Sequence, residues 1–329
     1  MQETNLWKYC TAEHCKAMLL SFHLLEGEEW TDEKVITCLY ALSNHAENHY
    51  TAIRVPKKSG GYRQILSPDP LLKTVQRNIL HHILEGFTVS PSAFAYCRGT
   101  DISQNAARHA GKKLVLKLDI HDFFGNITFS MVNQRAFSSL YFPPAVGTML
   151  TALCCYRDYL PQGSPASPAI SNLVMKPFDD YMEKWCGELG IAYSRYCDDM
   201  AFSGDFDGKM VVKKVRGFLE AMGFELNREK TRLLTEDFRQ TVTGIVVNEK
   251  PSVSSDYRRK LRQEVYYCER FGVSAHLERT GQKKYLEMGE AGERRYLQSL
   301  LGKIQFVLSV NPEDLWFQEA KQRLAREMG

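Results

Sequence analysis

Two carboxylates stand side by side in SRYCDDMAFSG, which runs from Ser194 to Gly204. At roughly 4 Å, two such charges repel each other by about 1 kcal/mol in water and by about 4 kcal/mol near a protein surface. A solvated hairpin turn tolerates this repulsion, and so does a site that holds divalent cations. Asp198 and Asp199 alone do not distinguish the turn from the site, so the rest of the sequence must decide.

A third acid, Asp119, lies near the end of a predicted strand in KKLVLKLDIHDFF. An acid at a strand end is often structural, but this one converges with Asp198 and Asp199 if the two strands are neighbours in a sheet. Three converging carboxylates require cations, and their hard oxygen atoms suit Mg²⁺. The alternation of residue types predicts a strand with two different faces. The apolar face is formed by Leu114, Leu116, Leu118 and Ile120, and the less apolar face by Val115, Lys117 and Asp119.

The elements around these acids predict an α+β fold. Helices are predicted within residues 1–50, one of them with Thr31 as its N-cap. Two strands joined by a glycine turn are predicted at TAIRVP and YRQILSP. Residues 130–157 also predict helix. Helical periodicity returns from Ser255, with breaks at Gly272, at Gly281 and at Asn311–Pro312. Further strands are indicated by IAYSRY, MAFSG, FELN, TRLLT and TVTGIVVN.

The composition limits the class of protein. The chain has 329 residues, of which 44% are hydrophobic and 25% charged, with a formal net charge of +3. It contains no apolar run of about 18 residues and no signal-peptide order at its start, which predicts a cytoplasmic enzyme with no membrane partner. Its nine cysteines include no CxxC pair and predict free thiols rather than a zinc site. Four basic clusters favour a nucleic-acid partner, at residues 54–64, 213–216, 227–232 and 257–262.

Several motifs in series resemble a reverse transcriptase. They are Asp119 with Phe124 five residues later, LPQGSPASP at residues 160–168 and YCDD at residues 196–199. KKSGGYRQI resembles the fingers of that family, GFELNREKT and TGIVVN the end of its palm, and LLGKIQFVLSVNP its thumb. The resemblance covers about residues 50–315. It implies a right-hand polymerase with a helical N-terminal extension (1–50), fingers and palm (51–250) and a helical thumb (251–329).

Two more motifs resemble retron reverse transcriptases, namely NAARH at residues 105–109 and VTG at residues 242–244. That resemblance implies an enzyme that copies a dedicated structured non-coding RNA into branched multicopy single-stranded DNA, primed from a guanosine 2′-hydroxyl. It also implies anti-phage defence with a separate effector protein. Two alternatives stay open: another small bacterial reverse transcriptase with different priming, and a non-catalytic scaffold that binds RNA–DNA and restrains a partner. Cys197 departs from the family, which more often has alanine there.

The resemblance assigns the reaction to three acids and five nucleotide-binding residues. Asp119, Asp198 and Asp199 would bind two Mg²⁺ ions, with Asp199 contributing less directly because adjacent side chains diverge in extended backbone. Arg63, with Lys57 or Lys58, would contact the triphosphate of the incoming dNTP, although each also fits a surface charge. Phe124 would lie beneath the sugar and exclude a 2′-hydroxyl, or is a core aromatic beside Phe123. Gln162 and Gly163 would pack against nucleotide and template.

The remaining candidates concern the primer, the template and the RNA. Tyr196 and Cys197 would neighbour the primer end, and Lys230 would hold a primer phosphate or a product oxygen, or is simply solvated. Asn105 and His109, four residues apart on a predicted helix, could hydrogen-bond one another, the palm or RNA, and they favour a role in organising the fold over a role in catalysis. Thr243 and Gly244 either touch the priming RNA or shape a strand.

Overall fold

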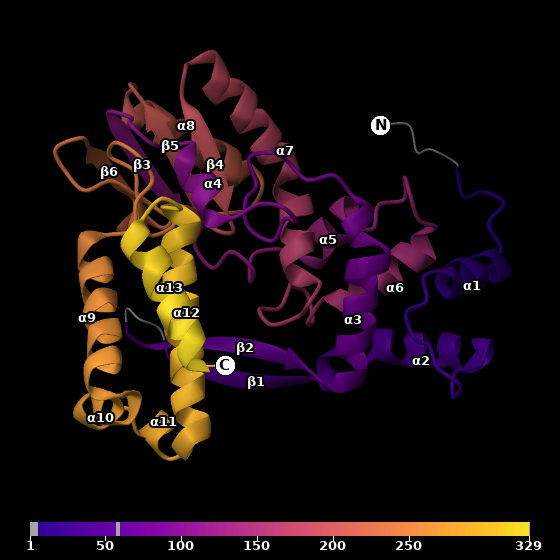
Figure 1. Cartoon of the computed structure of the whole chain (residues 1–329). Helices are drawn as coiled ribbons and strands as arrows, with labels where there is room; N and C mark the ends of the chain where they lie inside the picture. The colour runs from indigo at the N-terminus through magenta and orange to yellow at the C-terminus, as the bar shows by residue number, and fades with distance from the viewer. Residues whose placement is uncertain (1–5, 57–59, 329) are drawn as a thin grey trace. The chain divides into compact units, whose positions relative to one another are not determined.

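The computed structural model describes residues 6–56 and 60–328, which form two compact units (Figure 1). The first unit comprises residues 1–100, 117–201 and 207–232, and the second comprises residues 101–116, 202–206 and 233–329. Strands β3, β5 and β6 pass from one unit to the other. No helix in the described part of the chain is both long and apolar enough to cross a membrane.

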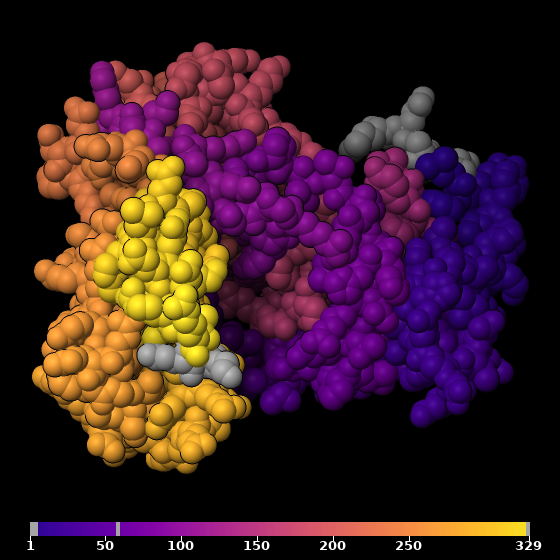
Figure 2. All heavy atoms as spheres, in the orientation of Figure 1, coloured from indigo at the N-terminus to yellow at the C-terminus, as the bar shows by residue number. Residues whose placement is uncertain are grey.

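The first unit begins with the predicted helices, α1 (Ala12–Ser21) and α2 (Asp32–Asn44), followed by the short helix η1 (Ala46–His49). Thr31 caps α2, as predicted, by accepting a hydrogen bond from the Lys34 N–H. The segment between α1 and α2 is fixed to α3 (Pro70–His82), because the Asn78 side chain donates to the Leu24 carbonyl at 3.0 Å. The space-filling view shows these N-terminal residues as an indigo surface (Figure 2).

A two-stranded hairpin follows η1, as the sequence predicts. Strands β1 (Tyr50–Pro56) and β2 (Tyr62–Pro68) pair antiparallel, with Tyr50 opposite Pro68 and Pro56 opposite Tyr62. Lys57 and Lys58 lie outside the described residues. Helix α3 and the short helix η2 (Leu84–Gly86) come next.

Helix occurs within residues 130–157, as predicted, but it is divided in two. The structure has two helices there, α5 (Phe129–Arg135) and α6 (Pro144–Cys154). Pro143 and Pro144 explain the division, because proline lacks the N–H that a helix interior needs but is well accommodated in a first turn. The long helix α7 (Ser167–Glu188) then begins inside the proline-rich loop.

The central sheet has four strands in the order β4-β5-β3-β6. Phe178 of α7 packs against Tyr193 of β4 and also against Phe218 of α8 (Gly208–Ala221), so one aromatic ring of α7 contacts both the sheet and α8. On the less apolar face predicted for residues 115–119, Val115 and Asp119 are buried and Lys117 is half-buried, so this face of β3 is also largely covered. The elements of this layer are β3 (Leu114–Asp119), β4 (Ala192–Tyr196), β5 (Asp199–Gly204), α8 (Gly208–Ala221), η3 (Arg228–Lys230) and β6 (Arg232–Thr235).

Two predicted strands differ from the structure. FELN forms a single antiparallel bridge, between Leu226 and Ile120, before the chain turns into η3. TVTGIVVN is a hairpin of β7 (Thr241–Val242) and β8 (Ile245–Val246) rather than one strand. Its two turn residues, Thr243 and Gly244, have φ of 48° and 84°, and positive φ at both central positions is the tight turn that matches strand twist.

The second unit also contains the C-terminal helices, which break at the glycines and at Asn311–Pro312 as predicted. Helix α12 packs against both α9 and α13, and Figure 1 shows α12 and α13 side by side. The helices of this unit are α4 (Ile102–Ala107), α9 (Ser255–Phe271), α10 (Val273–Arg279), α11 (Lys283–Leu286), α12 (Gly289–Val310) and α13 (Leu315–Met328).

Candidate active site

Neighbouring strands bring the three predicted acids into one region, here called the acidic site (Asp119, Asp198 and Asp199). Asp119 is the last residue of β3, Asp198 lies in the turn between β4 and β5, and Asp199 begins β5. Strands β5 and β3 are adjacent in the sheet, which is the condition that convergence required. The Ile120 N–H donates to the Asp198 carbonyl at 3.1 Å and fastens the turn to the end of β3.

The turn that carries the acids has an unusual backbone. Cys197 adopts a φ of 62°, a left-handed conformation that side chains other than glycine rarely take. Its thiol is buried and accepts a hydrogen bond from the Tyr96 hydroxyl at 3.5 Å. Tyr196, just before it, closes β4. Such strain persists only where surrounding contacts hold it, and it is concentrated at functional sites.

The acidic site is short of positive charge. Partial burial and the negative charges of Asp198 and Asp119 raise the pKa of Asp199 to about 6. Asp199 is exposed to solvent, which limits the effect of burial on its pKa. We therefore attribute the raised pKa mainly to the repulsion from Asp198 and Asp119. Lys230 contacts the site directly: its Nζ lies 2.7 Å from Asp119 Oδ2, and this hydrogen bond raises the pKa of Lys230. Lys117 also lines the smaller cavity, and its charge acts against the rise in the pKa of Asp199.

Two cavities meet at Asp119. The larger, of about 1080 Å³, is lined by Asp119 and Asp198, and the smaller, of about 260 Å³, by Asp119 and Asp199. Lys230 lines both cavities. Asp198 and Asp199 therefore face different spaces, in agreement with the expected divergence of adjacent side chains.

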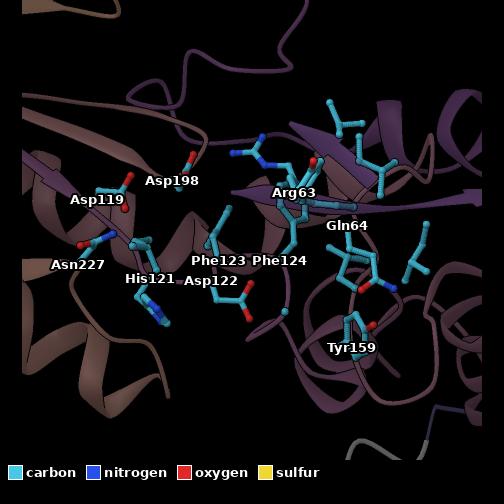
Figure 3. A pocket seen from close by; sticks show the side chains of 18 of the residues that line it. Arg63, Gln64, Asp119, His121, Asp122, Phe123, Phe124, Tyr159, Asp198 and Asn227 are labelled. Carbon is cyan, nitrogen blue, oxygen red and sulfur yellow. The ribbon is translucent and has the colours of Figure 1, made fainter. Parts of the chain in front are cut away.

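The larger cavity also collects most of the predicted nucleotide-binding residues, namely Arg63, Phe124 and Gln162. Figure 3 shows the guanidinium of Arg63 pointing toward the side that carries Asp119 and Asp198, with Phe124 below it in this view. Phe124 is 8% exposed and contacts the Phe123 ring at 5.4 Å between centroids, so it is both a core aromatic and a wall of the cavity.

Gln162 and Gly163 join the proline-rich loop to the hairpin. The Gln162 carbonyl accepts a hydrogen bond from the Leu66 N–H at 2.7 Å. Gly163 has a φ of 125°, and a Cβ there would lie 2.4 Å from the Leu66 carbonyl oxygen. The close approach of β2 therefore explains why position 163 is glycine, independently of any contact with a nucleotide.

The two motifs of the retron resemblance lie together in the second unit. Asn105 and His109 are both buried, and His109 Nδ1 lies 2.7 Å from the Ser203 hydroxyl. The Thr243 hydroxyl donates to the Ile102 carbonyl at 3.4 Å, which joins the β7–β8 turn to the helix that carries Asn105. No hydrogen bond to Asn105 Oδ1 is found in the described part of the chain, although that atom is buried.

Sequence reasoning missed other residues that line the larger cavity. Tyr62, Asp122 and Tyr159 all contribute to its wall. Asp122 has a φ of 40° and is exposed. Its position three residues after Asp119 was the available signal, because a strand that ends at a site is followed by the loop that completes the site.

The acidic site has the right donors for Mg²⁺, since carboxylate oxygens are its preferred ligands. Within the described residues, no three His, Cys, Asp or Glu side chains are already gathered closely enough to form a preassembled metal cluster. The ammonium that contacts Asp119 shows, however, that a cation is accommodated beside this carboxylate. The chemistry of the donors therefore fits the metal.

A family model for reverse transcriptase (RNA-dependent DNA polymerase) matches residues 55–282. The chain belongs to the reverse transcriptase family. This reverse transcriptase is 35% identical over 236 residues to the retron Mx65 reverse transcriptase of Myxococcus xanthus, covering 65% of this chain and 55% of that protein. It is 29% identical over 277 residues to the retron Ec86 reverse transcriptase of Escherichia coli, covering 81% and 85% respectively.

These relatives confirm the retron resemblance, and the family confirms the right-hand polymerase class of fold. Helices α1 and α2 confirm the predicted helical N-terminal region. The chain spans about half the length of the Mx65 enzyme. Among solved structures, the telomerase of Candida albicans in complex with a fragment of telomeric RNA aligns at a TM-score of 0.45 and 10% identity, covering 89% of this chain and 67% of that chain. That likeness is too weak to support a conclusion.

Proposed function

We propose that this protein is the RNA-directed DNA polymerase of a retron. The observation that carries the proposal is a single cavity lined by two acids of the acidic site, Asp119 and Asp198, together with Arg63 and Phe124. Two carboxylates, a cation and an aromatic wall are what a polymerase needs to bind a nucleoside triphosphate beside a growing chain. The retron relatives identify the type of reverse transcriptase.

The acidic site would hold two Mg²⁺ ions, with Asp119 and Asp198 as the principal ligands and Asp199 as the more distant one. Magnesium bound there supplies activation of the attacking hydroxyl and stabilisation of charge on the leaving pyrophosphate. Lys230 would release Asp119 and become available to a phosphate oxygen of primer or product. Tyr196 and Cys197 would lie next to the primer end.

The nucleotide would be held from the hairpin side. Arg63 would contact the triphosphate, as cations do on transferring phosphoryl groups, and Lys58 stays a prediction. Phe124 would meet the sugar and exclude a 2′-hydroxyl. Gln162 and Gly163 would support the hairpin from the loop. A Phe124→Val variant should accept rNTPs about 10- to 100-fold better relative to dNTPs, since the smaller side chain leaves room for the hydroxyl.

The template would be a dedicated structured non-coding RNA, and the product a branched RNA–DNA hybrid primed from a guanosine 2′-hydroxyl. Asn105 and His109 would hold the β7–β8 turn in place, and Thr243 and Gly244 would face the priming RNA. The extension, fingers and palm, and thumb would occupy residues 1–50, 51–250 and 251–329. A cytoplasmic role in anti-phage defence with a separate effector protein completes the proposal.

Primer extension tests the polymerase. The wild type should extend a DNA primer on an RNA template with dNTPs and Mg²⁺, and a variant with Asp198→Asn and Asp199→Asn should lose at least about 10³-fold in rate. Asp205→Asn is the matched control, because Asp205 is an exposed acid bonded to Lys113. A double variant that still makes DNA would contradict the assignment, and a wild type that binds RNA without extending it would favour the scaffold.

Sequencing the nucleic acid that copurifies with the protein tests the retron type. The expected product is DNA joined covalently to one guanosine of one RNA. Unrelated cellular RNA without a branch would instead favour another small bacterial reverse transcriptase.

A further inference from the structure

A fully buried arginine precedes the turn that carries the acidic site. Arg195 lies on β4, two residues before Cys197, and is 0% exposed. Arginine is almost never fully buried unless its charge is paired and its N–H groups are bonded. The roles assigned so far do not use Arg195, so its partners require an explanation.

A buried carboxylate neutralises this arginine. Asp179 of α7 is also 0% exposed at its side chain, and it accepts hydrogen bonds from Arg195 Nε at 2.9 Å and Nη2 at 2.6 Å. The Tyr193 hydroxyl donates to the same carboxylate at 2.8 Å. Burial opposes the charge of Arg195, but the Asp179 carboxylate raises its pKa, so the pair stays ionised.

The guanidinium also bonds groups other than Asp179, including the backbone of the turn that carries the acidic site. Arg195 Nη1 donates to the Cys197 carbonyl at 2.9 Å, and Nη2 also donates to Asn172 Oδ1 at 3.0 Å. Cys197 is the residue with the left-handed φ of 62°. We call Arg195, Asp179, Asn172 and Tyr193 the Arg195 cluster.

The turn is therefore held at two successive carbonyls from two different elements. Arg195 of β4, itself held by Asp179 and Asn172 of α7, donates to the Cys197 carbonyl, and the Ile120 N–H at the end of β3 donates to the Asp198 carbonyl. The side chain of Asp198 departs from the backbone between these two attachments. A turn fixed in this way presents its carboxylate in one direction, which a metal-binding carboxylate requires.

We propose that Arg195, anchored by Asp179, is a positioning residue that holds the Cys197–Asp198 turn in the conformation that presents Asp198 to the acidic site. The proposal rests on the proposed polymerase function. It assigns Arg195 no contact with substrate, because the residue acts through the Cys197 carbonyl.

The proposal depends on the planar fork of arginine. One guanidinium reaches a carboxylate, an amide oxygen and a backbone carbonyl at once, whereas the single ammonium of lysine does not match that geometry. Replacing both charges by apolar residues offers the cleaner test. Such a replacement of a buried ion pair is often tolerated by the fold, but it removes the donor to Cys197.

The central experiment compares the wild type with the double variant Arg195→Met and Asp179→Leu. We expect a melting temperature near that of the wild type, a kcat for primer extension lowered about 10- to 100-fold, and a KM for dNTP changed by less than about threefold. The Mg²⁺ concentration for half-maximal rate should rise several-fold. Thermal unfolding without Mg²⁺ gives a readout that does not depend on activity.

The matched control is an exposed ion pair on α7 that includes Asp180, the residue after Asp179. Lys176 and Asp180 form an ion pair at 2.8 Å, and the double variant Lys176→Met and Asp180→Leu should leave melting temperature, kcat and Mg²⁺ dependence unchanged. The second variant is Arg195→Lys, which keeps the charge pair but loses the reach to Cys197. It should fold and still show the lowered kcat.

The outcomes separate this inference from the proposed function. A folded double variant, or a folded Arg195→Lys variant, with wild-type kcat and Mg²⁺ dependence would overturn the positioning role. Failure of both variants to fold would overturn it too, because the cluster would then serve folding alone. An inactive wild type would instead count against the polymerase itself.

Discussion

The acidic site and the Arg195 cluster are joined by a single turn, yet they treat charge in opposite ways. In the cluster, one buried carboxylate is matched by one buried guanidinium and by the Tyr193 hydroxyl. In the acidic site, three carboxylates face the exposed ammonium of Lys230, which bonds Asp119, and the charge of Lys117, which acts on Asp199. The cluster balances its charge within the chain, whereas the acidic site keeps an excess of negative charge that a cation could balance.

The largest effect on stability should come from breaking the cluster on one side. Asp179→Leu alone leaves the Arg195 charge buried without its carboxylate, so the free energy of unfolding should fall by about 3–5 kcal/mol. Urea denaturation measures this value. A single variant as stable as the wild type would show that the two regions do not differ in the way proposed.

A buried histidine extends the comparison to pH. Burial lowers the pKa of His109 from 6.5 to about 3. The unfolded chain then binds more protons than the folded one between these values, so stability falls as the pH falls, by about 2 kcal/mol between pH 7 and pH 5 from this residue. His109→Gln should flatten the pH dependence of unfolding, whereas His45→Gln, at an exposed site, should not.

Asp199 of the acidic site should make stability depend on pH in the opposite direction. Because the pKa of Asp199 is raised to about 6, the folded state binds the extra proton, and the charged carboxylate weakens the metal-free fold at neutral pH. Asp199→Asn should therefore stabilise the metal-free protein by no more than about 1 kcal/mol, given its exposure. Adding Mg²⁺ should raise the melting temperature of the wild type more than that of the variant. A variant less stable than the wild type without metal would contradict this.

The smallest effect is expected at the surface. Lys176→Met breaks an ion pair with Asp180 whose side chains are 37% and 46% exposed. The change in unfolding free energy should stay within about 0.5 kcal/mol, because solvent and salt screen such pairs. A loss of stability as large as that of Asp179→Leu would show that burial does not explain the difference between the two ion pairs.

The sequence predicted that the three acids converge because Asp119, LPQGSPASP and YCDD follow one another in the order of the reverse transcriptase family, whereas Asp198 and Asp199 alone were equally compatible with a solvated turn. It also predicted the hairpin over 50–68 and the helix breaks at glycine, since these depend on local backbone preference. The split at Pro143 and Pro144 was available in the sequence and was missed.

The Arg195 cluster was not predicted, because its partners come from α7 and β4 and meet only in the folded chain. A signal existed, namely a single arginine within the β-prone run IAYSRY, because a charge inside a strand that becomes buried requires a partner. The β7–β8 turn was missed for a similar reason. Thr243 gives no local indication of a positive φ, and tertiary contacts of the turn select it.

Gly163 has a practical consequence for anyone who wishes to change which nucleotides this enzyme accepts. A Cβ at this position would clash with the Leu66 carbonyl, so any other amino acid would push the loop away from β2. Gln162 is bound to the same strand through its backbone, which leaves its side chain open to substitution. A mutational library should therefore keep position 163 as glycine and vary position 162, where most amino acids should still give a folded enzyme.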